Sequence, residues 1–84
     1  MIKLISIFFI IINLINSTLA ENSFFEEGKK KYNEKKYEES KFLFQRSIVF
    51  NPKDQYSYLY LAKIYKFEDN KREELKNIST VLLL

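Results

Sequence analysis

The chain matches itself at an offset of 34 residues, and this internal match is the feature that most constrains its fold. When residues 24–50 are shifted by 34 positions onto residues 58–84, nine positions match in kind, and those at core-like places keep their apolar or small character. The clearest pairs are Phe24 and Tyr58, Gly28 and Ala62, Lys29 and Lys63, Phe44 and Ile78, and Ile48 and Leu82. Periods of about 20–50 residues are typical of folds built from stacked structural repeats.

The spacing within each unit is helical. Phe24, Gly28 and Tyr32 recur every four residues, and Phe44, Ile48 and Asn51 follow the i, i+4, i+7 rule of a helix with one apolar face. The polar run 33–36 separates these two stretches. Each unit therefore contains two helices.

Turn and cap residues delimit the later helices. Asn51 and Pro52 end the second helix, because the residue before a proline leaves the helical region and proline lacks an N–H donor. Asp54 is placed to cap a third helix over residues 55–67, and after a break at 68–70 a fourth helix runs from residue 71 to the end. The expected fold class is all-α, with two antiparallel helical hairpins over residues 21–54 and 55–84, the second incomplete at the C-terminus.

This pattern resembles the tetratricopeptide repeat, a helical hairpin unit that stacks into an α-solenoid. The residues that carry the resemblance are Phe24, Gly28, Tyr32, Tyr37, Ser40, Phe44, Ser47, Ile48, Asn51 and Pro52 in the first unit, and Tyr58, Leu61, Ala62, Tyr65, Ile78, Val81 and Leu82 in the second. The resemblance implies that Gly28, Ala62, Phe44 and Pro52 are scaffold, with Gly28 and Ala62 at helix crossings. Glu74 departs from the pattern, because the family has a small residue there.

The resemblance also implies a concave groove, lined by the first helix of each unit, that binds a partner peptide or helix. By helical spacing, the stripes facing it are Phe25, Lys29 and Tyr32, and then Tyr56, Tyr60, Lys63 and Phe67. Alternating rings and ammonium groups suit a partner with apolar and acidic residues. Some members of the family bind a terminal carboxylate in this groove through Lys, Asn and Arg side chains. The matching positions here are Phe25 and Tyr60, so we expect no carboxylate clamp. The alternative is that Phe25 and Tyr56 only pack against neighbouring structure.

Composition excludes several kinds of chemistry. The chain has no His, no Cys, no Trp and one Gly, so it has no Ser-His-Asp triad, thiol nucleophile, His/Cys zinc site or glycine-rich phosphate loop. Its net charge of +3 comes from interspersed signs, unlike the one-sided basic stripe of a nucleic-acid surface. We expect a protein without catalysis, cofactor, metal or nucleic-acid partner; an enzyme using Glu26 and Glu38 as acid and base is a weaker alternative.

Residues 1–20 differ from the rest, with 14 hydrophobic residues and one charge. Lys3, the apolar run 4–12 and the small-x-small end 18–20 have the order of a signal peptide, cleaved after Ala20. This predicts a periplasmic or secreted protein. An uncleaved anchor, holding the protein on a membrane through these residues alone, and a buried helix of a soluble protein remain as alternatives.

The remaining 64 residues are fewer than two full repeats, whereas stacked repeats generally need about three to bury a continuous core. The run 81–84 is entirely apolar. We therefore expect the chain to dock on another protein, to self-associate through this run, or to be the N-terminal part of a longer repeat array. The expected function is that of an exported adaptor for protein–protein interaction.

Overall fold

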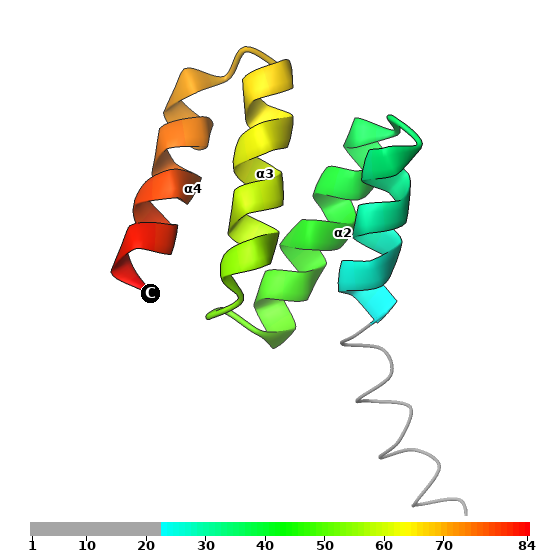
Figure 1. Cartoon of the computed structure of the whole chain (residues 1–84), viewed down its shortest axis with the longest axis horizontal. Helices are drawn as coiled ribbons and strands as arrows, with labels where there is room; N and C mark the ends of the chain where they lie inside the picture. The colour runs from blue at the N-terminus through cyan, green and yellow to red at the C-terminus, as the bar shows by residue number, and fades with distance from the viewer. Residues whose placement is uncertain (1–22) are drawn as a thin grey trace, which may run out of the picture.

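The computed structural model describes residues 23–84, which fold into four helical stretches with no strand among them. The first helix covers residues 23–33 of the described chain, and it is followed by α2 (Tyr37–Phe50), α3 (Gln55–Phe67) and α4 (Lys71–Leu83). Consecutive helices run antiparallel and are joined by short turns (Figure 1). The all-α prediction is confirmed for these residues, within which no helix is long and apolar enough to cross a membrane. The predicted signal segment lies outside them.

Local sequence explains where each helix begins and ends. Phe50 is the last residue of α2, directly before the Asn51-Pro52 pair that was expected to stop it. Asp54 caps α3 by accepting a hydrogen bond from the backbone N–H of Tyr56 at 3.1 Å, as predicted. The first break is shorter than predicted, because Asn33 is still helical and only residues 34–36 form the turn.

The turns inside the two helix pairs are the same under the 34-residue shift. Lys35 and Asp69, which the shift superposes, both adopt positive φ angles, of 62° and 58°. The next residues, Lys36 and Asn70, each donate the backbone N–H to the carbonyl five residues earlier, both at 2.9 Å. This is the Schellman closure of a helix C-terminus, in which one residue takes the left-handed conformation. The repeat in the sequence is thus also a repeat in backbone geometry.

The first helix and α2 cross closely at Gly28. An added Cβ at Gly28 would lie 3.0 Å from Cε1 of Phe44, which is fully buried. Ser40 in turn donates a hydrogen bond from its hydroxyl to the Gly28 carbonyl at 2.8 Å. The close approach expected at Gly28 is present, and the Ser40 hydroxyl is buried there with a hydrogen-bond partner.

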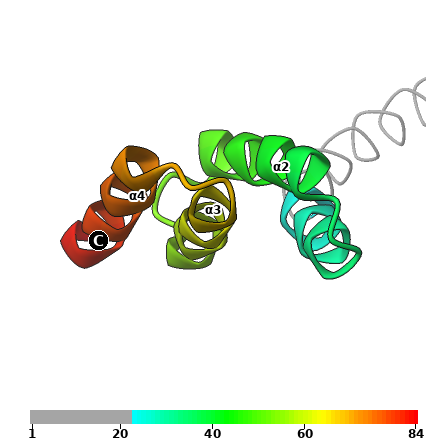
Figure 2. The same ribbon diagram turned by 90° about the horizontal axis from the view of Figure 1, so that it is seen from above.

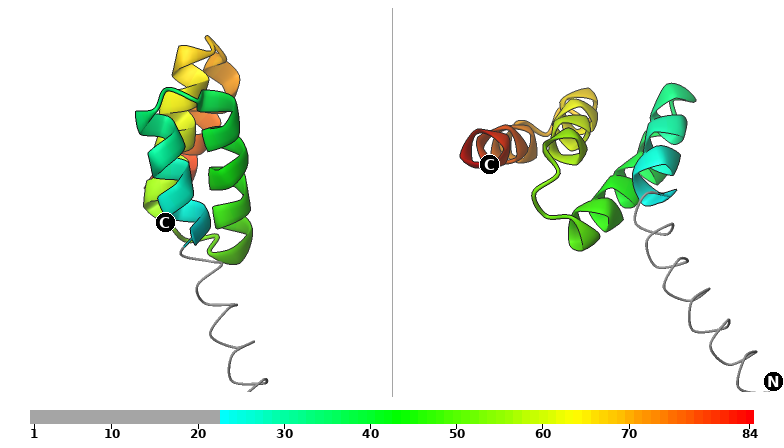
Figure 3. Two further views of the ribbon diagram at one scale, coloured as in Figure 1. Left: turned by 90° about the vertical axis from the view of Figure 1, so that its right-hand side faces the viewer. Right: turned by 60° about the horizontal axis from the view of Figure 1, so that its bottom comes forward.

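The core forms where α3 packs against the first helix pair. Phe44, Leu61 and Ile64 are its buried apolar residues, and the ring of Tyr60 stacks on Phe44 with centroids 4.7 Å apart. Seen from above, α3 and the first helix lie on the same side of α2 (Figure 2). Seen from the side, the first helix and α2 stand together in front of α3 and α4 (Figure 3, left). This arrangement brings residues far apart in sequence onto one surface.

The helix α4 packs on α3 but leaves much apolar surface uncovered. Asn77 is its one buried residue, and its amide donates to the Glu73 carbonyl at 2.8 Å. Glu74, which was expected to be difficult at a close-packed position, forms an ion pair with Lys71 at 3.7 Å. Exposed apolar side chains of α4 and the last residue are Leu75, Ile78, Leu82, Leu83 and Leu84.

Candidate protein-interaction surface

A cluster of aromatic rings joins the first helix to α3. Tyr60 is at its centre, with ring centroids 5.1 Å from Tyr32 and 6.2 Å from Phe25, both in edge-to-face geometry. Phe25 also meets the buried ring of Phe44 at 5.8 Å. Such pairs contribute about 0.5–1.5 kcal/mol each beyond their buried area. Three predicted site residues, Phe25, Tyr32 and Tyr60, therefore lie together and are also partly buried packing residues.

Two more rings extend this cluster toward the turn ends of the helices. Tyr37, the first residue of α2, stacks on Phe67 at 4.9 Å and meets Tyr32 at 5.5 Å. Phe67 is 61% exposed, so its ring is open to solvent on one side. Tyr37 was absent from the predicted site; its position among the repeat-pattern aromatics was the signal that could have included it. We call Phe25, Tyr32, Tyr37, Tyr60 and Phe67 the aromatic surface.

Two lysines flank the aromatic surface. The Lys29 ammonium lies 5.3 Å from the ring centroid of Phe25, and the Lys63 ammonium lies 5.3 Å from that of Tyr60. Both distances are within the range of cation–π attraction. Lys29 also forms an ion pair with Glu26 at 3.6 Å. The lysines are held beside the rings and leave N–H donors for a carboxylate.

Tyr56 is the predicted site residue that stands apart. It is 66% exposed and has no ring contact with another aromatic of the described residues. Its backbone N–H donates to the carboxylate of Asp54, so its position follows from the cap of α3. The structure thus gathers Phe25, Lys29, Tyr32, Tyr60 and Lys63 and leaves Tyr56 at the edge as an accessible ring.

Burial affects the titration of Tyr32. Desolvation raises the pKa of its phenol, and the neighbouring phenols of Tyr37 and Tyr60 raise it further. The hydroxyl therefore stays neutral at physiological pH and can both donate and accept a hydrogen bond.

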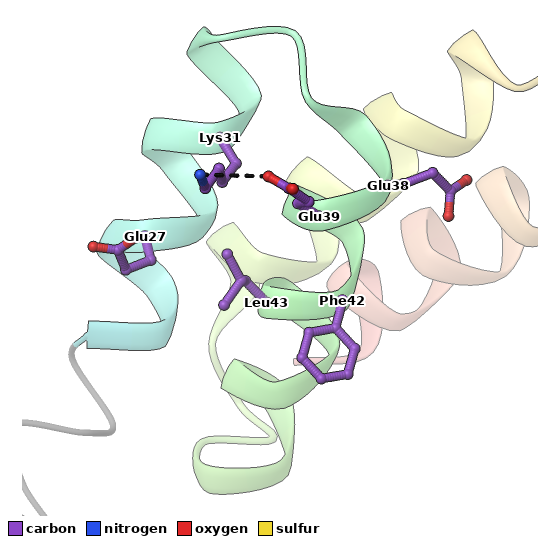
Figure 4. Close-up of a pocket in the computed structure, with 6 residues that line it drawn as sticks. All are labelled: Glu27, Lys31, Glu38, Glu39, Phe42 and Leu43. Atoms are coloured by element: carbon purple, nitrogen blue, oxygen red, sulfur yellow. Dashed lines mark ion pairs between the residues drawn. The ribbon is translucent and has the colours of Figure 1, made fainter.

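A hollow of about 520 Å³ lies on the outer face of the first helix and α2. Phe42 and Leu43 form its apolar part, and Lys31 pairs with Glu39 across it at 3.4 Å (Figure 4). Glu27 and Glu38 complete the lining. Three carboxylates and one ammonium give this hollow an acidic balance.

A second hollow, of about 200 Å³, lies between α3 and α4, and we call it the α3–α4 hollow. Its lining residues are Leu59, Ala62, Lys63, Lys66, Glu74 and Ile78. Its only carboxylate, Glu74, is already paired with Lys71. The balance here is basic, the opposite of the first hollow.

The carboxylates considered as an acid–base pair are each engaged with a lysine. Glu26 pairs with Lys29, and Glu38 pairs with Lys41 at 3.2 Å. Both glutamates are largely exposed, which suits ion pairs on a solvated surface. Within residues 23–84 no group of three or more His, Cys, Asp or Glu side chains is arranged to hold a metal ion.

Comparison with protein-family models, with curated proteins and with solved structures gives no significant match for this chain. A function must therefore be argued from the residues and their geometry.

Proposed function

We propose that this chain is an adaptor of the tetratricopeptide-repeat type, which binds a protein or peptide partner and carries out no catalysis. The observation that carries the proposal is the aromatic surface with a lysine at each of two rings, Lys29 over Phe25 and Lys63 over Tyr60. Aromatic rings, tyrosine above all, are among the side chains that dominate protein-binding hot spots, and ammonium groups beside them attract a partner's carboxylates. A partner segment with apolar and acidic side chains matches this surface.

The repeated backbone geometry supports the choice of repeat family. The equal turns at Lys35 and Asp69, the crossing at Gly28 and the antiparallel helix pairs are features that a two-repeat unit requires. The small core also favours an interaction role, because residues 23–84 bury only four apolar residues and a bound partner would add to their stability.

The place of action in this proposal is a periplasm or secretory lumen, reached through residues 1–20 as a signal peptide cleaved after Ala20. In the alternative form the same residues stay in the bilayer and the helical part recruits a partner to the membrane surface. The N-terminal sequence of the exported protein distinguishes them, since retention of Met1 contradicts cleavage.

The adaptor function is tested by partner capture with surface variants. Full-length chain serves as bait in a crosslinking capture from the exported fraction, and the double variant Lys29→Glu and Phe67→Ala is compared with the unaltered chain. Both side chains are accessible, so the fold is retained, unlike after substitution of Tyr60, which stacks on the core. We expect capture of the specific partner to fall about ten-fold or more, the size of a hot-spot loss.

A matched control carries the same changes elsewhere. Lys53→Glu and Phe42→Ala alter an exposed lysine in the α2–α3 turn and an exposed ring on the outer face of α2. The control should capture as well as the unaltered chain. Equal capture by all three proteins, with equal helical circular dichroism, would remove the aromatic surface as the binding site.

A further inference from the structure

The α3–α4 hollow has a counterpart that is already occupied within the same molecule. When its six lining residues are shifted back by 34 positions, they become Phe25, Gly28, Lys29, Tyr32, Ser40 and Phe44. Those residues of the first helix pair form the surface against which α3 packs: Tyr60 alone contacts the rings of Phe25, Tyr32 and Phe44. The surface of the first helix and α2 is thus covered by α3, whereas the equivalent surface of α3 and α4 is an open hollow.

The open surface is apolar at the positions that matter for docking a helix. Ile78 takes the place of Phe44 and is 37% exposed, and Leu59 takes the place of Phe25 and is 39% exposed. Phe44 itself is fully buried beneath Tyr60. An occupant with a large ring at the place of Tyr60 would cover both side chains.

A second copy of the chain fits this surface poorly. In head-to-tail stacking, the first helix of the next copy would present Glu26 and Lys30 where α3 presents Tyr60 and Ile64. Ile64 is fully buried, and a lysine in so buried a place would lose its hydration, which is costly for a charged group. Two-fold pairing would bring Lys63, Lys66 and Lys71 of both copies together, and like charges across an interface are unfavourable.

The charges of the hollow identify a better occupant. Lys63 and Lys66 make no ion pair with a carboxylate of residues 23–84, and Lys71, the first residue of α4, pairs with the lining residue Glu74 at 3.7 Å. The packing of α3 on the first helix pair indicates which position of a helix bound in the α3–α4 hollow would lie near Lys66 and Lys71. Phe67 lies between Tyr32 and Tyr37, at 6.4 and 4.9 Å, and the shift converts those two tyrosines into Lys66 and Lys71.

We propose that the α3–α4 hollow binds an amphipathic helix of a partner protein that carries an aromatic residue, an apolar residue four positions later, and an acidic residue three positions after that. These three places correspond to Tyr60, Ile64 and Phe67 of α3. The ring covers Leu59 and Ile78, and the carboxylate lies between Lys66 and Lys71. The site extends the adaptor function to a second surface, which borders the aromatic surface at Lys63 but is lined by none of its rings.

The probe for this site is a synthetic peptide of residues 54–70, which contains α3 and its Asp54 cap. One version carries Phe67→Glu and a matched version carries Phe67→Lys. Binding of each labelled peptide to the full-length chain in mild detergent is measured by fluorescence anisotropy at low ionic strength. We expect the acidic peptide to bind about five-fold more tightly, the effect of two exposed ion pairs gained, and this preference should shrink as salt is added.

Protein variants locate the site and exchange its preference. Lys66→Glu with Lys71→Glu should bind the lysine peptide more tightly than the acidic one. Ile78→Glu should abolish binding of both peptides, and Leu59→Glu gives an independent check should the first variant lose its helical circular dichroism. Both side chains are partly exposed, so a glutamate at either remains in contact with water.

Two binding results would overturn the proposal: equal affinity of the two peptides, or a preference that the charge exchange leaves unchanged. A concentration-dependent oligomer of the chain that Ile78→Glu dissociates would also overturn it, since this would show that a second copy occupies the α3–α4 hollow. The control Lys29→Glu with Phe67→Ala separates the two proposed surfaces, because neither residue lines the α3–α4 hollow. It should leave peptide binding unchanged while it removes partner capture, so failure at one surface is distinguishable from failure at the other.

Discussion

Replacement of Gly28 by alanine is the sharpest test of the packing in the first helix pair. Gly28 lies inside a helix, where alanine is ordinarily better by about 1 kcal/mol. Helix propensity alone therefore predicts that Gly28→Ala stabilises the protein. The close approach of Gly28 to Phe44 predicts that it destabilises the protein.

The added methyl group has no free space. It would stand 3.0–3.1 Å from three atoms of the Phe44 ring, well inside ordinary van der Waals contact. The ring cannot move aside, because Tyr60 stacks on it at 4.7 Å and Phe25 meets it at 5.8 Å. Overpacking of this kind costs about 1–3 kcal/mol, and after the gain in helix propensity we expect a net loss of about 1 kcal/mol.

Urea unfolding, monitored by the helical circular dichroism signal, measures this loss in the free energy of unfolding. In the double variant Gly28→Ala with Phe44→Leu, the smaller side chain makes room for the methyl group, so the two changes together should cost less than their sum. Ala62→Gly is the matched control at the superposed position, and it should cost about 1–2 kcal/mol, because it loses helix propensity and a buried methyl group. If Gly28→Ala raises the unfolding midpoint, the close crossing of the first helix and α2 is wrong.

Two further predictions concern the positive-φ turn residues and the loss of stability at alkaline pH. Lys35→Gly should raise the free energy of unfolding by about 0.5–1 kcal/mol, because Lys35 holds a positive φ that glycine adopts without strain. Asp69→Gly should raise it less, since aspartate tolerates this conformation better, and an equal or larger gain at Asp69 in the same urea assay would contradict the argument. The hydrogen bond to Glu68 raises the pKa of Lys41, and burial raises the pKa of Tyr32. In both cases the folded state holds the proton more tightly, so stability is full at neutral pH and falls above about pH 10. Urea midpoints measured across that range should fall less steeply for Lys41→Met and for Tyr32→Phe, and unchanged slopes in both would contradict the assignment.

Helix boundaries were accessible from sequence because local chemistry sets them. The proline after Asn51, the cap at Asp54 and the polar run after Phe67 act within a few residues, and α3 and α4 begin where they were expected. Asn33 was assigned to a turn because it is polar, but backbone hydrogen bonds of the helix extend through it. A single polar residue carries too little information to decide the last position of a helix.

The candidate site was predictable only in part. Helical spacing placed Phe25, Tyr32 and Tyr60 on neighbouring stripes that face one groove, and the structure brings these rings into contact with each other. Spacing could not show that the same rings are partly buried, since this depends on how closely α3 approaches Phe44. It also omitted Tyr37, which reaches the surface from α2 across a turn.

The sequence by itself determined the repeat period, the helical class and the residues at which helices stop, because each depends on neighbours along the chain. Only the tertiary structure decided which face of each helix is covered and which is left open. Gly28 and Ala62 are equivalent in sequence and both are buried, yet the ring of Phe44 beside Gly28 is covered by α3, whereas Ile78 and Leu59 beside Ala62 are partly exposed in a hollow. The physical reason is that burial of a repeat's surface depends on which helix packs against it. A sequence pattern that recurs in both repeats does not show whether such a helix is present.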